Sequence, residues 1–149
     1  MTATGHAVIG TVIAATIGIP IIAIPIAVLS HTLADLVPHW DAGTNMKEKT
    51  HQRFFFDSAV DVILSYIVSY LLVIFLFPQT SIIYAFIMVF AAQFFDWLMI
   101  PYLYLNLKNP IFKAFVNFQG MFNSRLDKPW GIVTQVIVCS GLVILAKAL

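Results

Sequence analysis

Four long runs of apolar residues constrain the fold of this chain more than any other feature of its sequence. The runs cover residues 7–29, 57–77, 81–100 and 130–146. Each approaches or exceeds the roughly 20 apolar residues that a helix needs to cross the hydrocarbon core of a bilayer. Backbone groups in lipid must find partners inside the chain, and runs this long favour helices over barrel strands. The sequence therefore predicts an all-α integral membrane protein.

The overall composition supports this fold class and excludes others. Only 10% of the residues are charged and 60% are hydrophobic, whereas soluble domains carry about 25% charged residues. A formal net charge of +1 offers no basic face that could neutralise the phosphates of a nucleic acid. The lone Cys139 excludes an internal disulfide. The predicted partners are the lipid bilayer and either further copies of this chain in a homo-oligomer or a larger membrane complex, with no nucleic acid.

The first apolar run is interrupted at Gly18-Ile19-Pro20, which leaves two topologies open. One is a single kinked span. The other is a broken or re-entrant hairpin of helices over about 5–16 and 20–36, with the proline starting the second helix. The hairpin returns His6 to the same side as His31, whereas the single span puts them on opposite sides. We favour the hairpin.

The rest of the chain is predicted to complete a single helical membrane domain. Three membrane segments are expected over about 57–77, 81–100 and 130–147, and Pro101 is expected to end the second of these. Residues 110–123 alternate apolar and polar side chains at helical spacing, which predicts an amphipathic helix at the membrane interface.

Lysine and arginine predict the orientation of this domain. The two large loops hold nearly all of them, namely Lys47, Lys49, Arg53, Lys108, Lys113, Arg125 and Lys128. The turn at 78–80 holds none, and only Lys147 falls on the opposite side. The positive-inside rule therefore places both large loops in the cytoplasm.

The stretch Ser30–Asp41 concentrates side chains that bind metals. It holds two histidines and two aspartates, His31, Asp35, His39 and Asp41. His31 and Asp35 are four residues apart and share a helical face, and Pro38 ends that helix. Imidazole and carboxylate are the ligands that zinc, manganese and iron sites use. The stretch is a candidate metal site, and a polar cap at the membrane interface is the alternative.

With the hairpin topology, histidines and aspartates from several segments converge at one membrane depth. His6, His31 and Asp35 would supply a two-histidine, one-carboxylate set, completed by His39 or by an aspartate of a later helix. A divalent metal there, with zinc as a candidate, would lower the pKa of bound water to about 7 and polarise a phosphoryl or carbonyl oxygen. The predicted catalytic residues are Asp41, Asp61 and Asp96, one of which would act as general base. Buried aspartates within apolar segments normally face a bundle interior.

Several stretches carry a resemblance to a known family. The specific block combines Gly5-His6-Ala7-x-x-Gly10 with Ser30-His31-x-x-x-Asp35-x-x-Pro38-His39-Trp40-Asp41. Later stretches that are alike are Asp96…Pro101, Lys108-Asn109-Pro110, Phe118-Gln119 and Lys128-Pro129-Trp130-Gly131. With these stretches the chain resembles small bacterial members of the YdjM-like family of membrane-bound metal-dependent hydrolases.

The resemblance implies a bacterial inner-membrane protein with predicted hydrolase activity. The positions that match the family's metal residues are His6, His31, Asp35 and His39. The family pattern also leads us to expect a histidine just after Phe118-Gln119, where this chain has Gly120. The predicted function is a metal-dependent hydrolase at the cytoplasmic membrane face, acting on a lipid or another phosphoester. The alternative is a non-catalytic accessory or structural subunit of a larger membrane complex, with which the missing histidine is compatible.

Overall fold

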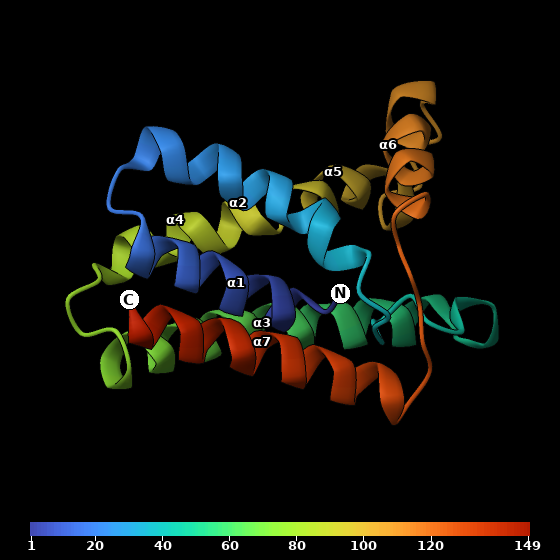
Figure 1. Ribbon diagram of the computed structural model, residues 1–149. Coiled ribbons are helices and arrows are strands. Elements are labelled where there is room, and N and C mark those ends of the chain that lie inside the picture. The colour runs from blue at the N-terminus through green and yellow to red at the C-terminus, as the bar shows by residue number, and fades with distance from the viewer.

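The computed structural model describes residues 1–149 and contains helices but no strands (Figure 1). The elements are α1 (Ala3–Thr16), α2 (Pro20–Asp35), a short 3-10 helix η1 (Met46–Glu48), α3 (His51–Phe75), α4 (Ile82–Ala92), α5 (Phe94–Leu103), α6 (Pro110–Gly120) and α7 (Trp130–Ala148). The prediction of an all-α chain is confirmed.

Helix α1 is the centre of the bundle. It packs against α2, α3, α4 and α7, and its residues from Gly5 to Ala14 are all buried. A helix that is apolar on every side is typical of a position in a protein core or in a membrane, and here other helices cover it. Gly10 permits the closest approach, because a Cβ there would lie 2.7 Å from the carbonyl oxygen of Met88 in α4. Small residues of this kind let helix backbones pack closely in apolar surroundings.

The chain reverses direction between α1 and α2, as the hairpin topology predicts. Thr2 caps the start of α1 by accepting a hydrogen bond from the Gly5 amide, and Pro20 occupies the first turn of α2. Figure 1 shows the two helices running side by side in opposite directions, so a single unbroken span is excluded. The N-terminus of α1 and the C-terminus of α2 consequently lie at the same end of the bundle.

Two helices, α3 and α7, are long and apolar enough to cross a membrane. The predicted segment over 81–100 is instead two helices, because α4 and α5 meet at Gln93 with a bend of 54°. Counted together, these two helices make a third candidate span. Pro101 does not end the helix as predicted; α5 continues to Leu103, and the Tyr104 amide donates to the Ile100 oxygen at 2.9 Å beyond the proline.

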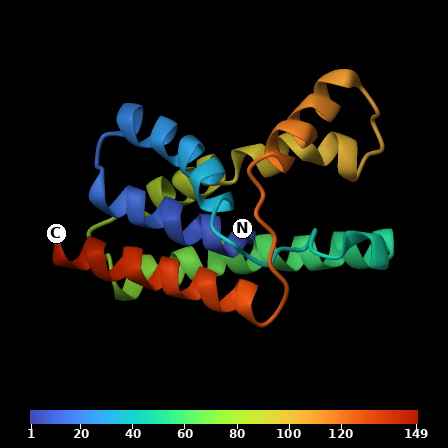
Figure 2. The same ribbon diagram turned by 45° about the vertical axis from the view of Figure 1, so that its right-hand side comes forward.

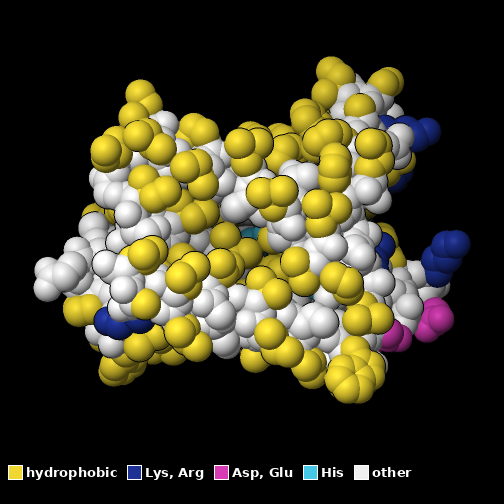
Figure 3. Space-filling model, viewed as in Figure 1, with side chains coloured by type: hydrophobic (Ala, Val, Ile, Leu, Met, Phe, Trp, Pro, Cys, Tyr) yellow, Lys and Arg dark blue, Asp and Glu magenta, His cyan; other side chains and the backbone are white.

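Charge and apolar surface are separated along the bundle. Figure 3 shows apolar side chains over most of one face, with most visible charged side chains at the right-hand end, where α6 and the start of α3 lie. Large apolar side chains such as Ile63, Phe75 and Ile137 are more than half exposed on α3 and α7. Such faces are compatible with a lipid environment. In Figure 2 the α5–α6 hairpin projects away from the bundle at the charged end.

Candidate metal centre

Two histidines from the two arms of the N-terminal hairpin form the base of a buried polar cluster. The imidazole rings of His6 in α1 and His31 in α2 are stacked, with centroids 3.9 Å apart and planes at 7°. Both side chains are 1% exposed. The reversal at Gly18-Ile19-Pro20 is what brings them together, because residues 25 positions apart on one straight helix would be more than 35 Å apart at ~1.5 Å per residue.

His31 and His39 each have one ring nitrogen fixed by a backbone carbonyl. Nδ1 of His31 donates to the oxygen of Ala92 at 2.7 Å, and Nδ1 of His39 donates to the oxygen of Val37 at 2.7 Å. A carbonyl only accepts, so the neutral form of each ring carries its lone pair on Nε2. Backbone contacts of this kind hold metal-binding histidines in the required tautomer.

His6 has no hydrogen-bond partner at either ring nitrogen, although it is buried. The Asp35 carboxylate lies beside it, with His6 Nε2 and Asp35 Oδ1 3.2 Å apart. Buried polar atoms almost always have partners, and one that lacks them indicates a missing ion, water or ligand. A metal bound at Nε2 would satisfy this ring.

Asp35 and Asp96 supply the carboxylates of the cluster. Oδ2 of Asp35 lies 3.4 Å from His31 Nε2, and Oδ1 of Asp96 lies 3.8 Å from the same nitrogen. The amino group of Met1 contacts Asp35 and lies 2.6 Å from His39 Nε2. Asp96 stands in the first turn of α5, where the helix dipole favours negative charge. The bend at Gln93 aims this turn at the histidines.

The amide of Gln119 in α6 joins the cluster, and the sequence did not predict this role. Its Nε2 lies 2.9 Å from His31 Nε2, 3.2 Å from Asp35 Oδ2 and 3.2 Å from Asp96 Oδ1. An amide nitrogen carries two hydrogens and cannot fully satisfy three acceptors. A lone pair and two carboxylates that converge on one point suit a cation. The only signal in the sequence was the Phe118-Gln119 stretch of the family resemblance.

His39 is held by pairing between two loops. Its backbone donates to the Ser124 oxygen at 2.9 Å and accepts from the Leu126 amide at 2.7 Å. The next residue, Trp40, donates to the oxygen of Gly131 at 3.1 Å. A Cβ at Gly131 would lie 2.6 Å from the Trp40 nitrogen, so only glycine fits this approach. The loop after α2 is thus fixed against the start of α7.

Asp41 lies at the edge of the cluster and is engaged by polar groups. It accepts from Thr44 Oγ1 at 2.9 Å and from Arg125 Nε at 3.3 Å. Burial alone would raise the pKa of its carboxyl, but the His39 ring, 3.8 Å away, and the Arg125 guanidinium lower that pKa below its usual range. Asp41 is therefore ionised and weakly basic.

Asp61 is apart from the histidines. Its carboxylate accepts from the Ala3 and Thr4 amides at 2.7 and 3.1 Å and from Thr4 Oγ1 at 2.7 Å. It therefore caps the first turn of α1, in which His6 lies.

The metal ligands predicted from the sequence and the residues that the structure brings close enough to share a metal ion are partly the same. His6, His31 and Asp96 offer ligand atoms that all lie within 4.8 Å of one another, so this group could hold a metal ion. Asp96, predicted as catalytic, thus joins the ligand group. Asp35 contacts both histidines, and His39 approaches the cluster through Asp35, with Nε2 and Oδ1 3.9 Å apart, and through the Met1 amino group, 2.6 Å from Nε2.

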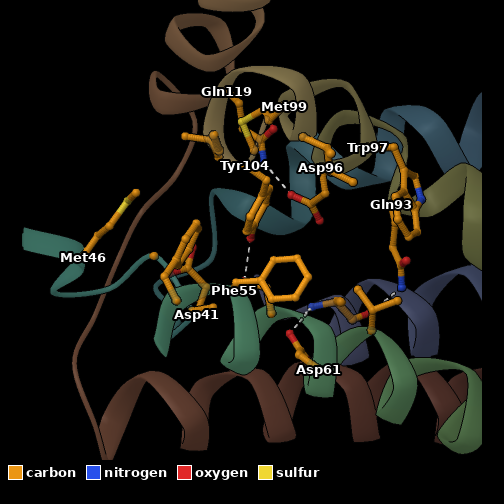
Figure 4. A pocket seen from close by; sticks show the side chains of 18 of the residues that line it. Asp41, Met46, Phe55, Asp61, Gln93, Asp96, Trp97, Met99, Tyr104 and Gln119 are labelled. Carbon is orange, nitrogen blue, oxygen red and sulfur yellow. Dashed lines mark hydrogen bonds between the residues drawn. The ribbon is translucent and has the colours of Figure 1, made fainter. Parts of the chain in front are cut away.

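A cavity of roughly 680 Å³ opens beside the cluster. Figure 4 shows Asp96 and Gln119 on one side of it, Asp61 on the opposite side and Phe55 and Tyr104 between them. The cluster can therefore be reached from outside the protein through Asp96.

Comparison of this chain with protein-family models, with curated proteins and with solved structures gives no match. The YdjM-like resemblance stays a prediction.

Proposed function

We propose that this protein is a metal-dependent hydrolase embedded in a membrane. The observation that carries the proposal is the buried His6 ring, both of whose nitrogens lack a hydrogen-bond partner beside His31, Asp35 and Asp96. Hydrogen bonds within the protein fix one nitrogen of each of the other two clustered histidines, whereas His6 has only the Asp35 carboxylate 3.2 Å from Nε2, without hydrogen-bond geometry, and no partner at Nδ1. A divalent cation, with zinc the candidate that suits this ligand mixture, would do so.

His6, His31 and Asp96 would hold the ion, and Asp35 would complete or orient the set. When bound, the ion would supply an activated water and polarise a phosphoryl or carbonyl oxygen. Asp96 is 38% exposed and faces the cavity, so a substrate reaches the centre on that side. Asp35 is buried, lies within reach of two histidines and is paired with the Met1 amino group, so it suits holding the two rings in place. The low basicity of Asp41 suits a positioning role as well.

The location proposed for this chemistry is the surface of a bacterial inner membrane. The apolar surfaces of α3 and α7 support membrane insertion, with α4 and α5 forming a third, bent span. Both lysine- and arginine-rich loops lie at the end of the bundle where α2 ends and α3 begins, and the positive-inside rule assigns this end to the cytoplasm. The metal centre would then face the cytoplasm.

A hydrolysis assay on purified protein tests the proposal. We expect cleavage of a soluble phosphodiester such as bis(p-nitrophenyl) phosphate, its loss after chelation, and its recovery when Zn²⁺ or Mn²⁺ is added. Asp96→Asn should lower the rate at least 100-fold, while His51→Ala, which alters the one histidine outside the cluster, should leave it unchanged. Hydrolysis that survives chelation would refute the metal mechanism. A co-purifying partner together with absent metal and absent hydrolysis would favour the accessory-subunit alternative.

A further inference from the structure

The cavity beside the metal centre has an apolar body. It lies among α3, α5, α6 and the loop after α2, and 16 of its 26 lining residues are hydrophobic. Phe55, Val62 and Ile63 of α3 face Trp97, Met99 and Ile100 of α5 across it. Its volume falls in the range of about 300–1,000 Å³ that is typical of ligand sites, which are mostly apolar with a few polar groups.

The cavity has polar groups at several places on its wall, and most are already engaged. Asp61 caps α1, and Asp41 is paired with Arg125. Asp96 and Gln119 belong to the metal cluster as well as to the cavity wall. Asp96 lies near no lysine or arginine within ion-pair distance. Met1 also lines the cavity, and its amino group is a buried cation that is paired with Asp35. A bound metal would add positive charge beside Asp96 and would draw an anionic ligand to that end of the cavity.

We propose that this cavity binds a phospholipid, with an acyl chain along the α3–α5 wall and its phosphate at the Asp96 end of the metal centre. The assignment rests on the proposed function, because the metal is what makes that end attractive to phosphate. The apolar wall explains why a lipid, and not a water-soluble phosphoester, is the ligand. Phe55 and Ile63 are 55% and 61% exposed, so the wall continues into the outer apolar face of α3. A chain can therefore enter sideways from the bilayer.

The cavity wall also holds a positive charge that complements this ligand. Arg125 lines the cavity, with its side chain 46% exposed beside Asp41. A guanidinium can donate to a phosphate oxygen while it keeps one hydrogen bond to a carboxylate. Arg125 therefore adds a positive group to the cavity wall on the Asp41 side, which favours an anionic ligand in the cavity.

Two valines of α3 provide a matched test. Val62 lines the cavity, whereas Val60 on the same helix is 37% exposed and does not. Val62→Phe should fill the cavity, and Val60→Phe should change only the outer surface. The assay is titration of the detergent-purified, metal-loaded protein with a fluorescent phosphatidic acid and with the matching diacylglycerol, which lacks the phosphate. Native mass spectrometry counts the lipids retained.

We expect wild type and Val60→Phe to bind one phosphatidic acid at least tenfold more tightly than diacylglycerol, and Val62→Phe to bind it at least tenfold more weakly. Ala59→Leu, a smaller addition to the same wall, provides a second test if Val62→Phe does not fold. Equal binding by the folded cavity variant and wild type, or equal binding of the two lipids, would overturn the proposal. The metal content of wild type separates the two proposals. A metal-free protein refutes the hydrolase, whereas a metal-loaded, hydrolytically active protein with an unselective cavity refutes only the lipid site.

Discussion

The replacement of Asp61 by alanine separates a structural role from a catalytic one. In the structure its carboxylate holds the Ala3 and Thr4 amides and the Thr4 hydroxyl, at distances of 2.7 to 3.1 Å. These groups form the start of α1, two and three residues before His6. Asp61→Ala would leave the two amides without the acceptor that they now share, because the first amides of a helix have no partner within it.

The expected loss of stability follows from these contacts. Removal of an N-terminal cap costs about 0.5–2 kcal/mol, and a hydrogen bond to a charged group contributes roughly 1.5–3 kcal/mol. Because the contacts share one carboxylate, we expect a loss of about 2–4 kcal/mol rather than their sum. At roughly 2–4 °C per kcal/mol for a chain of this size, the thermal midpoint should fall by about 5–15 °C. The metal should also bind more weakly, because His6 loses its support.

Thermal unfolding in detergent, followed by circular dichroism, measures this effect. Asp57→Ala is the matched control, because Asp57 lies one turn earlier in α3 and pairs only with Lys49 and Arg53, at 3.5 and 2.8 Å. Surface ion pairs of this kind are worth about 0–1 kcal/mol. Asp61→Asn should show an intermediate loss, because it keeps one acceptor oxygen. A fall in hydrolysis without a fall in the thermal midpoint would make Asp61 catalytic and refute the structural assignment.

Three further changes test the packing and the centre. Gly10→Leu should destabilise the fold by more than the roughly 1–3 kcal/mol typical of overpacking, since its Cβ would lie 2.7 Å from the α4 backbone, whereas Gly18→Ala, with nothing within 4 Å, should be tolerated in the same melting assay. Thr11 and Ser69 share a buried hydrogen bond of 2.7 Å, so Thr11→Val and Ser69→Ala should each cost about 1–3 kcal/mol and the double variant less than their sum, as a double-mutant cycle would show. Gln119→Ala should leave metal binding in place and alter its affinity by less than the loss of a histidine does, as isothermal titration would measure.

The sequence predicted the hairpin because its signals are local. Gly18-Ile19-Pro20 combines a helix stop with a helix start, and this alone brings His6 beside His31. Asp57, Asp61, Ser65 and Ser69 recur every four residues in the sequence, which places them on one face of α3, and the structure pairs Ser65 with the Gln93 amide at 2.9 Å. What the repeat cannot reveal is the partner, because partners depend on how helices pack.

The features that the sequence missed arise from tertiary contacts. The break between α4 and α5 at Gln93 contains neither glycine nor proline. The Gln93 side chain instead donates a hydrogen bond to the oxygen of Ala3 at 3.0 Å. Gln119 contacts His31 although the two residues are 88 positions apart in the sequence. No pattern in α6 distinguishes this glutamine from a surface amide. The assignment of Asp96 to the ligand group depends on the same bend.

The metal content of the purified protein tests the central claim most directly. Elemental analysis of wild type after extensive dialysis should give a stoichiometric divalent metal. His6→Ala should lose it, and His51→Ala should retain it, because His51 is exposed and lies outside the cluster. A wild-type protein that contains no metal when saturated with zinc, manganese or iron would contradict the account, as would a His6→Ala protein with the wild-type metal content.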